Sequence, residues 1–395
     1  MKKIAYISGP GDVLGTYGFW KSGQQDPRNP MAPYSTMFFD LASSLDTDAT
    51  IIHAHPSCKE LDDGKFHFRS VYEGSPKRSL RYHVSQFRVA VSLARKINRI
   101  SPSFVVMSSH APLITIRLIR RDIPIIYHLH NTFWTMGVPN KPTFKRKLRE
   151  RLLRFTVPVL KGTVCVSEEC RRQILPFISE HSQVLVYKPF MIRKVELKPY
   201  STRVRSIIYV GRIETNKGVF MLMDVFERLS GQFPDIGLRF VGDGGALEAL
   251  KERVARSKVR DRVMVTGRLG ADMVHEELAK SDLLICPTMS SFPEGLALVC
   301  LEAAAHGVPS IVSTAVPAQD VLGPACRVFD ADIPEALEVE LAAVIGNLDL
   351  YHSLAEGARS VSEALWDDSG KWGVQLSRLI ESLGENNRHH EAGQK

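Results

Sequence analysis

Short, nearly continuous apolar runs alternate with longer amphipathic stretches along most of the chain. The runs are Ile4–Ile7, Thr50–His53, Phe104–Met107, Ile123–His128, Ile207–Val210, Leu238–Val241, Arg262–Thr266, Leu283–Cys286 and Ser310–Ser313. Strands that are buried on both faces of a parallel sheet have this character. Segments between them, such as Phe220–Leu229 and Gly244–Arg256, have a helical period and predict crossover helices. The pattern therefore predicts an α/β protein with parallel sheets.

The alternation of strands and helices restarts after a segment rich in Pro, Lys and Arg, residues 188–205. We therefore predict two facing Rossmann-like, doubly wound domains. The expected division is an N-terminal domain at 1–190, a linker at 191–205, a C-terminal domain at 206–370, and a closing helix with a polar tail at 371–395. Ligands of such sheets bind at the carboxyl ends of the strands, so two facing domains predict a deep cleft between them.

Composition narrows the class of protein. The chain has 395 residues, of which 44% are hydrophobic and 24% charged, as in an ordinary globular protein. No apolar run approaches the roughly 20 residues that a membrane span requires, and the first residues lack the apolar core of a signal peptide. The six cysteines are scattered and form no C-x-x-C pair, which predicts free thiols in a reducing compartment. We expect a cytoplasmic protein, with peripheral contact to the inner face of the cytoplasmic membrane at most.

Positive charge is concentrated in the first half of the chain. Residues 1–200 carry 31 Lys and Arg against 15 Asp and Glu, and the densest basic segment is 141–161. Within it Leu148, Leu152 and Phe155 share one helical face, which predicts a helix lying on an anionic bilayer. The alternative is an ordinary domain helix that packs Leu and Phe inward and leaves its basic face in water. No nucleic-acid recognition motif accompanies the segment, so we expect no nucleic-acid partner.

The strongest chemical signal follows the predicted strand Leu283–Cys286. Glu294 and Glu302 flank the start of a predicted helix near Gly295, in the segment FPEGLALVCLE. Unpaired backbone N–H groups and the helix dipole make such a start an anion site. The two carboxylates are more than two helical turns apart, so they suit an extended ligand with an anion between hydroxyl groups. A nucleotide sugar has this layout.

A second signal is the segment VGRIETNKGV at Val210–Val219. Arg212 and Lys217 flank a turn between a buried strand and the next predicted helix. Two cations at a strand end, opposite a helix start, predict a clamp for a diphosphate.

These motifs carry a resemblance to a known family. In their order and spacing, YVGRIETNKGVFMLMDVF, LRFVGDGGALEAL, VTGR and the two spaced glutamates resemble the donor-binding domain of the family-four retaining glycosyltransferases of GT-B fold. The likeness is close over residues 206–325 and weaker in the first half. Trp372 also stands where the closing helix of that family often has a tryptophan. The resemblance implies transfer of a sugar from a UDP- or GDP-sugar to an acceptor hydroxyl with retention, in bacterial cell-surface polysaccharide or glycolipid synthesis. It also implies that the domain at 1–190 binds the acceptor and the domain at 206–370 binds the nucleotide sugar.

The resemblance also implies roles for residues of the second half. Arg212 and Lys217 would hold the donor diphosphate, Glu294 would bind hydroxyls of the donor sugar, and Glu302 would bind the ribose. The backbone of Gly295, Leu296 and Ala297 would contact the donor, and Gly267 would line the base pocket.

Two positions in the first half complete the implied site. PIIYHLHNTFW resembles the family strand that ends in a cleft-facing histidine, here His130. GPGDVLGTYG resembles the loop near the donor phosphates, with Gly15 as the matching glycine. The chain departs from the family pattern at residues 186–190, where an Asn-Gly turn is usual.

Other readings stay open. His53-x-His55 and His128-x-His130 each follow a strand, as in metal-dependent hydrolases, and Asp330-x-Asp332 resembles the metal motif of the other glycosyltransferase fold. Later strand ends offer few further ligands, so we expect no metal and no cofactor. A sugar-nucleotide epimerase of the same fold, or a non-catalytic sugar-nucleotide-binding protein, are the alternatives to a transferase.

Overall fold

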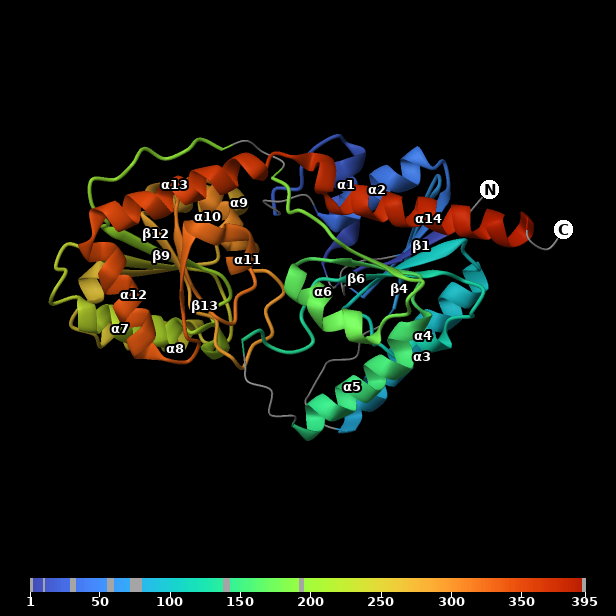
Figure 1. Ribbon diagram of the computed structural model, residues 1–395, viewed down its shortest axis with the longest axis horizontal. Helices are drawn as coiled ribbons and strands as arrows, with labels where there is room; N and C mark the ends of the chain where they lie inside the picture. Colours follow the sequence, from blue (N-terminus) through green and yellow to red (C-terminus); the bar gives the residue numbers. More distant parts are fainter. Residues whose placement is uncertain are drawn as a thin grey trace.

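The structure is a computed structural model that describes residues 3–9, 11–28, 33–54, 60–71, 80–137, 143–191 and 195–392. Two α/β domains lie side by side, each with helices on both faces of one sheet (Figure 1). This confirms the predicted fold class of two facing Rossmann-like domains. His55 of the His53-x-His55 motif, Cys58 (one of the six cysteines) and the first two residues of the basic segment 141–161 lie outside the described residues.

The N-terminal sheet has the strand order β3-β4-β2-β1-β5-β6-β7-β8. All neighbours are parallel except β3 and β4. Its strands are β1 (Lys3–Ile7), β2 (Asp48–His53), β3 (Leu61–Asp63), β4 (Phe66–Ser70), β5 (Phe104–Ser108), β6 (Ile125–Leu129), β7 (Gly162–Cys165) and β8 (Gln183–Val186). Its helices are α1 (Val13–Lys21), α2 (Tyr34–Ser44), α3 (Leu80–Ile100), α4 (Thr115–Leu118), α5 (Phe144–Thr156) and α6 (Glu168–Ile174).

The C-terminal sheet is parallel throughout and has the order β11-β10-β9-β12-β13-β14. Its strands are β9 (Ser206–Val210), β10 (Gly237–Val241), β11 (Val263–Gly267), β12 (Leu283–Cys286), β13 (Ser310–Ser313) and β14 (Cys326–Phe329). Its helices are α7 (Val219–Leu229), α8 (Leu247–Ala255), α9 (Ala271–Lys280), α10 (Leu298–Ala305), α11 (Gln319–Leu322), α12 (Pro334–Gly346) and α13 (Leu348–Ala364).

The last helix, α14 (Trp372–Ala392), returns to the N-terminal domain and lies beside α2 (Figure 1). Its first residue anchors it there. Trp372 is fully buried, with its ring 5.2 Å from His128 and 5.7 Å from Tyr34, measured between centroids. The chain therefore crosses between the domains twice, after β8 and before α14.

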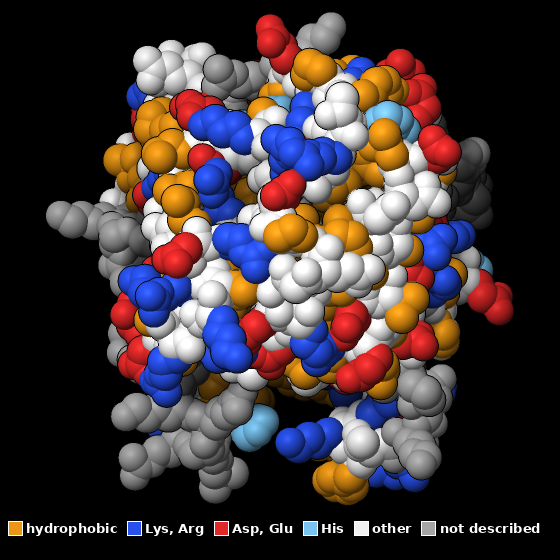
Figure 2. Space-filling model, turned by 90° about the vertical axis from the view of Figure 1, so that its left-hand side faces the viewer, with side chains coloured by type: hydrophobic (Ala, Val, Ile, Leu, Met, Phe, Trp, Pro, Cys, Tyr) orange, Lys and Arg blue, Asp and Glu red, His pale blue; other side chains and the backbone are white. Residues whose placement is uncertain are grey.

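The surface of the C-terminal domain contrasts with the basic first half of the chain. Figure 2 shows its outer face, where basic and acidic side chains are interspersed with apolar ones. No helix among the described residues is both long and apolar enough to cross a bilayer.

Candidate active site

Lys217 and Glu294 come together at the carboxyl end of the C-terminal sheet. Lys217 ends a short 3-10 turn after β9, and Glu294 lies in the loop between β12 and α10. The Lys217 ammonium forms an ion pair with the Glu294 carboxylate, and both side chains are mostly buried. It also lies 3.9 Å from the centre of the Phe292 ring. Each of these two charges therefore neutralises the other.

A glycine makes this approach possible. Gly218 has a left-handed backbone, with φ of 74°, and a Cβ there would lie 2.0 Å from the carbonyl oxygen of Pro287 at the end of β12. A side chain would push the Lys217 turn away from the strand that leads to Glu294. Glycine is therefore required after Lys217 so that the turn can pack closely against the end of β12.

Arg212 lies at the same aromatic ring but is far more accessible. Its guanidinium carbon is 5.1 Å from the Phe292 ring centre. The side chain is 56% exposed, and Nη1 is 2.9 Å from Oε1 of Glu214. The structure therefore gathers Arg212, Lys217 and Glu294 around Phe292, an aromatic residue that sequence reasoning missed.

The helix α10 starts directly after the loop that carries Glu294. The helix begins at Leu298, after Ala297, and no side chain caps its first N–H groups. Ala297 has a left-handed backbone, with φ of 68°, a conformation that is costly for a residue with a Cβ and is concentrated at functional sites. Leu296, in the same loop, is buried.

Glu302 is separated from Glu294 and faces a different part of the cleft. It lies within α10, is only 6% exposed, and lines a cavity between the domains. Burial raises the pKa of its carboxyl to about 7. A carboxylate kept in such a place, at a cost to its charged form, suits a ligand that supplies hydroxyl donors.

The N-terminal domain contacts the Glu294 loop directly. Thr132 Oγ1 donates to the carbonyl of Glu294 at 3.0 Å, and Ser167 Oγ donates to the carbonyl of Gly295 at 2.8 Å. A Cβ on Gly295 would lie 2.1 Å from the carbonyl oxygen of His130. Glycine is therefore needed here because the backbone of the other domain approaches so closely.

His130 follows β6 at this contact and belongs to a histidine pair. Its Nε2 lies 2.6 Å from Nδ1 of His110, and its Nδ1 lies 3.1 Å from Oγ of Ser109. Burial, then the neighbouring His110, lowers the pKa of His130 to about 3, and burial also lowers that of His110. Both rings are thus neutral near pH 7. His110 and Ser109 were missed, although they follow β5 as His130 follows β6.

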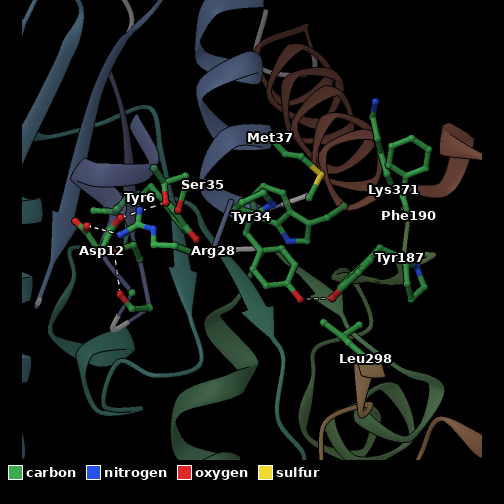
Figure 3. A pocket seen from close by; sticks show the side chains of 18 of the residues that line it. Tyr6, Asp12, Arg28, Tyr34, Ser35, Met37, Tyr187, Phe190, Leu298 and Lys371 are labelled. Atoms are coloured by element: carbon green, nitrogen blue, oxygen red, sulfur yellow. Dashed lines mark hydrogen bonds and ion pairs between the residues drawn. The ribbon is translucent and has the colours of Figure 1, made fainter. Parts of the chain in front are cut away.

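A cavity of about 560 Å³ lies between the domains next to Glu302. Figure 3 shows its N-terminal wall, with Arg28 beside Asp12 and the hydroxyls of Tyr34 and Tyr187 in contact. From the C-terminal domain it is lined by Arg268, Leu298 and Glu302, and residues 188–190 and 371–372 border it as well. Arg212 and Lys217 are not part of it, so the cavity covers the Glu302 end of the cleft.

The two other glycines that the sequence assigned to the site, Gly15 and Gly267, take different positions. Gly15 lies within α1, and its N–H donates to Oδ1 of Asp12 at 2.9 Å. Gly9 and Gly11 line the cavity instead. Gly267 ends β11 with φ of 74°, and Arg268, which follows it, lines the cavity.

Two of the candidate metal motifs, His128-x-His130 and Asp330-x-Asp332, lie within the part of the chain that the structure describes. Among the described residues no group of three or more His, Cys, Asp or Glu side chains could hold a metal ion. Asp332 accepts from the backbone N–H of Ser290 at 2.9 Å, and His128 is fully buried beneath Tyr34 and Trp372.

Two family models match the chain, one in each domain. "Glycosyltransferase Family 4" matches residues 36–186, and "Glycosyl transferases group 1" matches residues 196–361. Together they cover the two domains seen in the structure.

Two proteins with similar sequences are named as glycosyltransferases or as subunits of one. The gpi3 subunit of the phosphatidylinositol N-acetylglucosaminyltransferase of Schizosaccharomyces pombe is 25% identical over 42% of this chain and 36% of its own length. The GDP-mannose-dependent alpha-(1-6)-phosphatidylinositol monomannoside mannosyltransferase of Mycolicibacterium smegmatis is 27% identical over 45% of this chain and 47% of its own. The alignments thus span less than half of these relatives. In fold, the alpha,alpha-trehalose-phosphate synthase (UDP-forming) of Burkholderia vietnamiensis matches with a TM-score of 0.69 and 12% identity, over 98% of this chain and 99% of that one.

Proposed function

The chain belongs to family four of the glycosyltransferases, and from this premise we propose that it transfers a sugar from a UDP- or GDP-sugar to an acceptor hydroxyl. The observation that carries the proposal is the Lys217–Glu294 ion pair around Phe292, at the carboxyl ends of the strands and against the N-terminal domain. A donor sugar that hydrogen-bonds to Glu294 would release Lys217 to the diphosphate. The names of the relatives, which include a GDP-mannose-dependent and a UDP-forming enzyme, support this class of donor.

The charges of the site suggest how the leaving group of this reaction is stabilised. An acceptor oxygen forms a bond to the anomeric carbon, while the bond from that carbon to the diphosphate oxygen breaks. The nucleoside diphosphate leaves with both electrons of that bond, and its oxygen takes the proton of the acceptor hydroxyl. Lys217, Arg212 and the uncapped start of α10 stabilise the negative charge on the leaving group. We propose that the reaction needs no metal ion, since these groups supply the positive charge. We also propose that it proceeds with retention, because an acceptor hydroxyl that gives its proton to the leaving oxygen must lie on the same face of the sugar ring as that oxygen.

The remaining predicted residues receive their roles in the same proposal. Glu302 binds the ribose hydroxyls, and the backbone of residues 295–297 contacts the donor. Gly267, with Arg268 beside it, borders the base pocket. His130 offers a neutral ring and a backbone carbonyl to the cleft at Gly295. For Gly15 we propose an indirect role, because its N–H is already bound to Asp12.

We also propose that helix α5 holds the enzyme on the inner face of an anionic membrane, near a glycan or lipid-linked acceptor. On this helix Phe144, Leu148 and Phe155 are 80%, 58% and 53% exposed, although all three are apolar. Leu153 instead packs into the domain core. Exposed apolar side chains among Lys and Arg support the bilayer reading over a helix that buries its apolar face.

Vesicle co-sedimentation tests the membrane proposal. Wild type is compared with Lys145/Arg146/Lys147/Arg149→Gln on neutral and anionic vesicles, at low and high salt. Each Lys or Arg near an anionic surface contributes about 1 kcal/mol, which salt screens. We expect salt-sensitive binding to anionic vesicles that the substitutions weaken. Equal binding to both vesicle types, or no effect of the substitutions, would leave an enzyme that works on a soluble acceptor.

Thermal unfolding with a panel of nucleotide sugars tests donor recognition. A donor at a hundred times its Kd should stabilise the fold by ~2.7 kcal/mol. We expect one nucleotide sugar, and its nucleoside diphosphate, to raise the unfolding temperature of wild type. A panel with no stabilising member would contradict the proposed donor class.

A further inference from the structure

Two hydroxyl groups of the N-terminal domain hold the backbone of the loop that carries Glu294, residues 287–297 between β12 and α10. Thr132 Oγ1 donates to the carbonyl of Glu294 at 3.0 Å, and Ser167 Oγ donates to the carbonyl of Gly295 at 2.8 Å. Thr132 is 4% exposed and Ser167 is 3% exposed, so water has little access to either bond. The roles proposed above assign no function to these two hydroxyls.

One of the two donors belongs to the start of α6, a helix at the boundary between the domains (Figure 1). Ser167 directly precedes this helix and caps it, because its Oγ accepts from the N–H of Cys170 at 3.3 Å. The same helix pairs with the C-terminal domain through Nη2 of Arg172 and Oδ2 of Asp320 on α11, at 2.5 Å. Ser167 is therefore fixed at a place where the two domains meet.

The other donor is tied to the same helix from a distance in sequence. Gln173, a buried residue of α6, accepts with Oε1 from the N–H groups of residues 133 and 134, at 2.8 and 3.1 Å. These residues directly follow Thr132, so their backbone cannot shift without breaking both bonds. One short helix thus orders both hydroxyls that reach the loop.

The loop needs support of this kind because of Gly295. A Cβ there would lie 2.1 Å from the carbonyl oxygen of His130, so the position has no side chain that could fix the backbone. Glycine also has more backbone freedom than any other residue. The carbonyl of Glu294 belongs to the peptide group before the glycine, and the carbonyl of Gly295 belongs to the one after it. The two hydroxyls therefore hold both peptide groups beside the most flexible position of the loop.

Bonds to these carbonyls also determine the direction and strength of the N–H groups. Each peptide group is planar and trans, so the N–H of Gly295 points opposite to the carbonyl of Glu294, and the N–H of Leu296 opposite to that of Gly295. Because a hydrogen bond at the carbonyl polarises the amide, the N–H on the other side becomes a stronger donor. These N–H groups belong to the backbone that is proposed to contact the sugar donor.

We propose that Thr132 and Ser167 are positioning residues for sugar transfer, which orient and polarise the two peptide groups on either side of Gly295. The proposal rests on the proposed function for the reaction, whereas the positioning of the loop stands on the two hydrogen bonds. The loop is competent only while the N-terminal domain contacts it. Removal of either hydroxyl should lower turnover more than nucleotide affinity, because the negative charge on the leaving group grows in the transition state.

Four variants of the full chain separate positioning from stability. Thr132→Val removes the hydroxyl and keeps the shape, whereas Thr132→Ser keeps the hydroxyl. Ser167→Gly removes the second donor, and glycine caps a helix nearly as well as serine. Thr156→Val is the matched control, because Thr156 is fully buried and its Oγ1 donates at 2.8 Å to the carbonyl of Leu152 in the same domain. Thermal unfolding shows that each variant is folded.

The first measurements are kcat with the stabilising nucleotide sugar and the Kd of its nucleoside diphosphate. We expect Thr132→Val and Ser167→Gly each to lower kcat about 3–10-fold, the contribution of one neutral hydrogen bond, with a Kd close to that of wild type. Thr132→Ser should restore kcat, and Thr156→Val should lower the unfolding temperature without changing kcat. An unchanged kcat in Thr132→Val and Ser167→Gly, no recovery in Thr132→Ser, or an equal loss in the control would overturn the proposal.

Hydrogen exchange followed by mass spectrometry reports on the loop without any turnover. Peptides that cover residues 288–300 should exchange faster in Thr132→Val and Ser167→Gly than in wild type and Thr156→Val. Exchange that is the same in all four proteins would overturn the positioning of the loop, even if wild type transfers sugar. Faster exchange in the two variants, with a wild type that releases nucleoside diphosphate from no nucleotide sugar, would keep the loop contact and refute the transferase.

Discussion

The buried carboxyl of Glu302 makes the stability of the protein depend on pH in a defined direction. Its pKa is raised from 4.5 to about 7 by burial. Below pH 4.5 the group is protonated in both the folded and the unfolded chain and costs nothing. Between these values the unfolded chain releases the proton while the folded chain keeps it, so stability falls as pH rises. Above pH 7 the full cost is present.

The size of this cost follows from the shift. At 1.36 kcal/mol for each pKa unit, Glu302 destabilises the unliganded protein by about 3 kcal/mol above pH 7. Glu302→Gln keeps the shape and cannot ionise. We therefore expect the variant to be about 3 kcal/mol more stable than wild type at pH 8.5 and nearly equal to it at pH 5. For a domain of this size the gain corresponds to roughly 6–12 °C in the unfolding temperature.

Thermal unfolding at both pH values measures the effect. Glu248→Gln is the control, because Glu248 lies on α8 with a largely exposed side chain paired to Lys251, and it should show no such gain. A difference between Glu302→Gln and wild type that is the same at pH 5 and pH 8.5 would refute the reasoning. So would a wild type that is the more stable protein at pH 8.5.

Four further predictions concern the cleft. Lys217→Ala should lower kcat by ~10²–10³-fold and should also destabilise the fold, because Glu294 loses its ion-pair partner. Arg212→Ala should lower kcat with little effect on the unfolding temperature, since Arg212 is largely exposed. Near-normal turnover in both variants would refute the proposed diphosphate clamp. Glu302→Ala should mainly raise the donor Kd by calorimetry, losing about 1.5–3 kcal/mol, and an unchanged Kd would exclude the ribose role. Gly295→Ala should hold the domains apart, because the added Cβ meets the carbonyl oxygen of His130. We expect a larger radius of gyration and a lower kcat. An unchanged radius of gyration would contradict this prediction and show that the backbone at His130 moves to make room. Activity should survive EDTA, and loss that Mn²⁺ or Zn²⁺ restores would indicate a metal site.

The buried strands were predictable because burial on both faces leaves a continuous apolar signature. All nine predicted strands occur in the structure. The largest differences are two residues, at the start of β2 (Asp48 rather than Thr50) and at the start of β6 (Ile125 rather than Ile123). Five strands, β3, β4, β7, β8 and β14, were not predicted. Residues of β3, β4, β8 and β14 are partly exposed, so these strands lack the continuous apolar signature. The strand β7 is buried, but its four residues, GTVC, form too short an apolar run to stand out. The two-domain fold follows from the repeated pattern, whereas the return of α14 to the first domain depends on where Trp372 packs.

Only those site residues that belong to local sequence motifs could be predicted. Arg212, Lys217 and Glu294 stand next to strand ends, and the structure brings them together. The contact of Gly295 with His130 joins positions far apart in sequence and leaves no local pattern. Phe292 could be mistaken for an ordinary loop aromatic. His110 could have been found, since it follows β5 in the same way that His130 follows β6.

The most direct test of the account is turnover of the donor that stabilises the fold. Wild type and Lys217→Ala are incubated with that nucleotide sugar, and release of the nucleoside diphosphate is followed with and without acceptor. The account predicts slow release by wild type alone, faster release with an acceptor, and release ~10²–10³-fold slower in the variant. No release from any nucleotide sugar by wild type, or equal rates in wild type and Lys217→Ala, would contradict it.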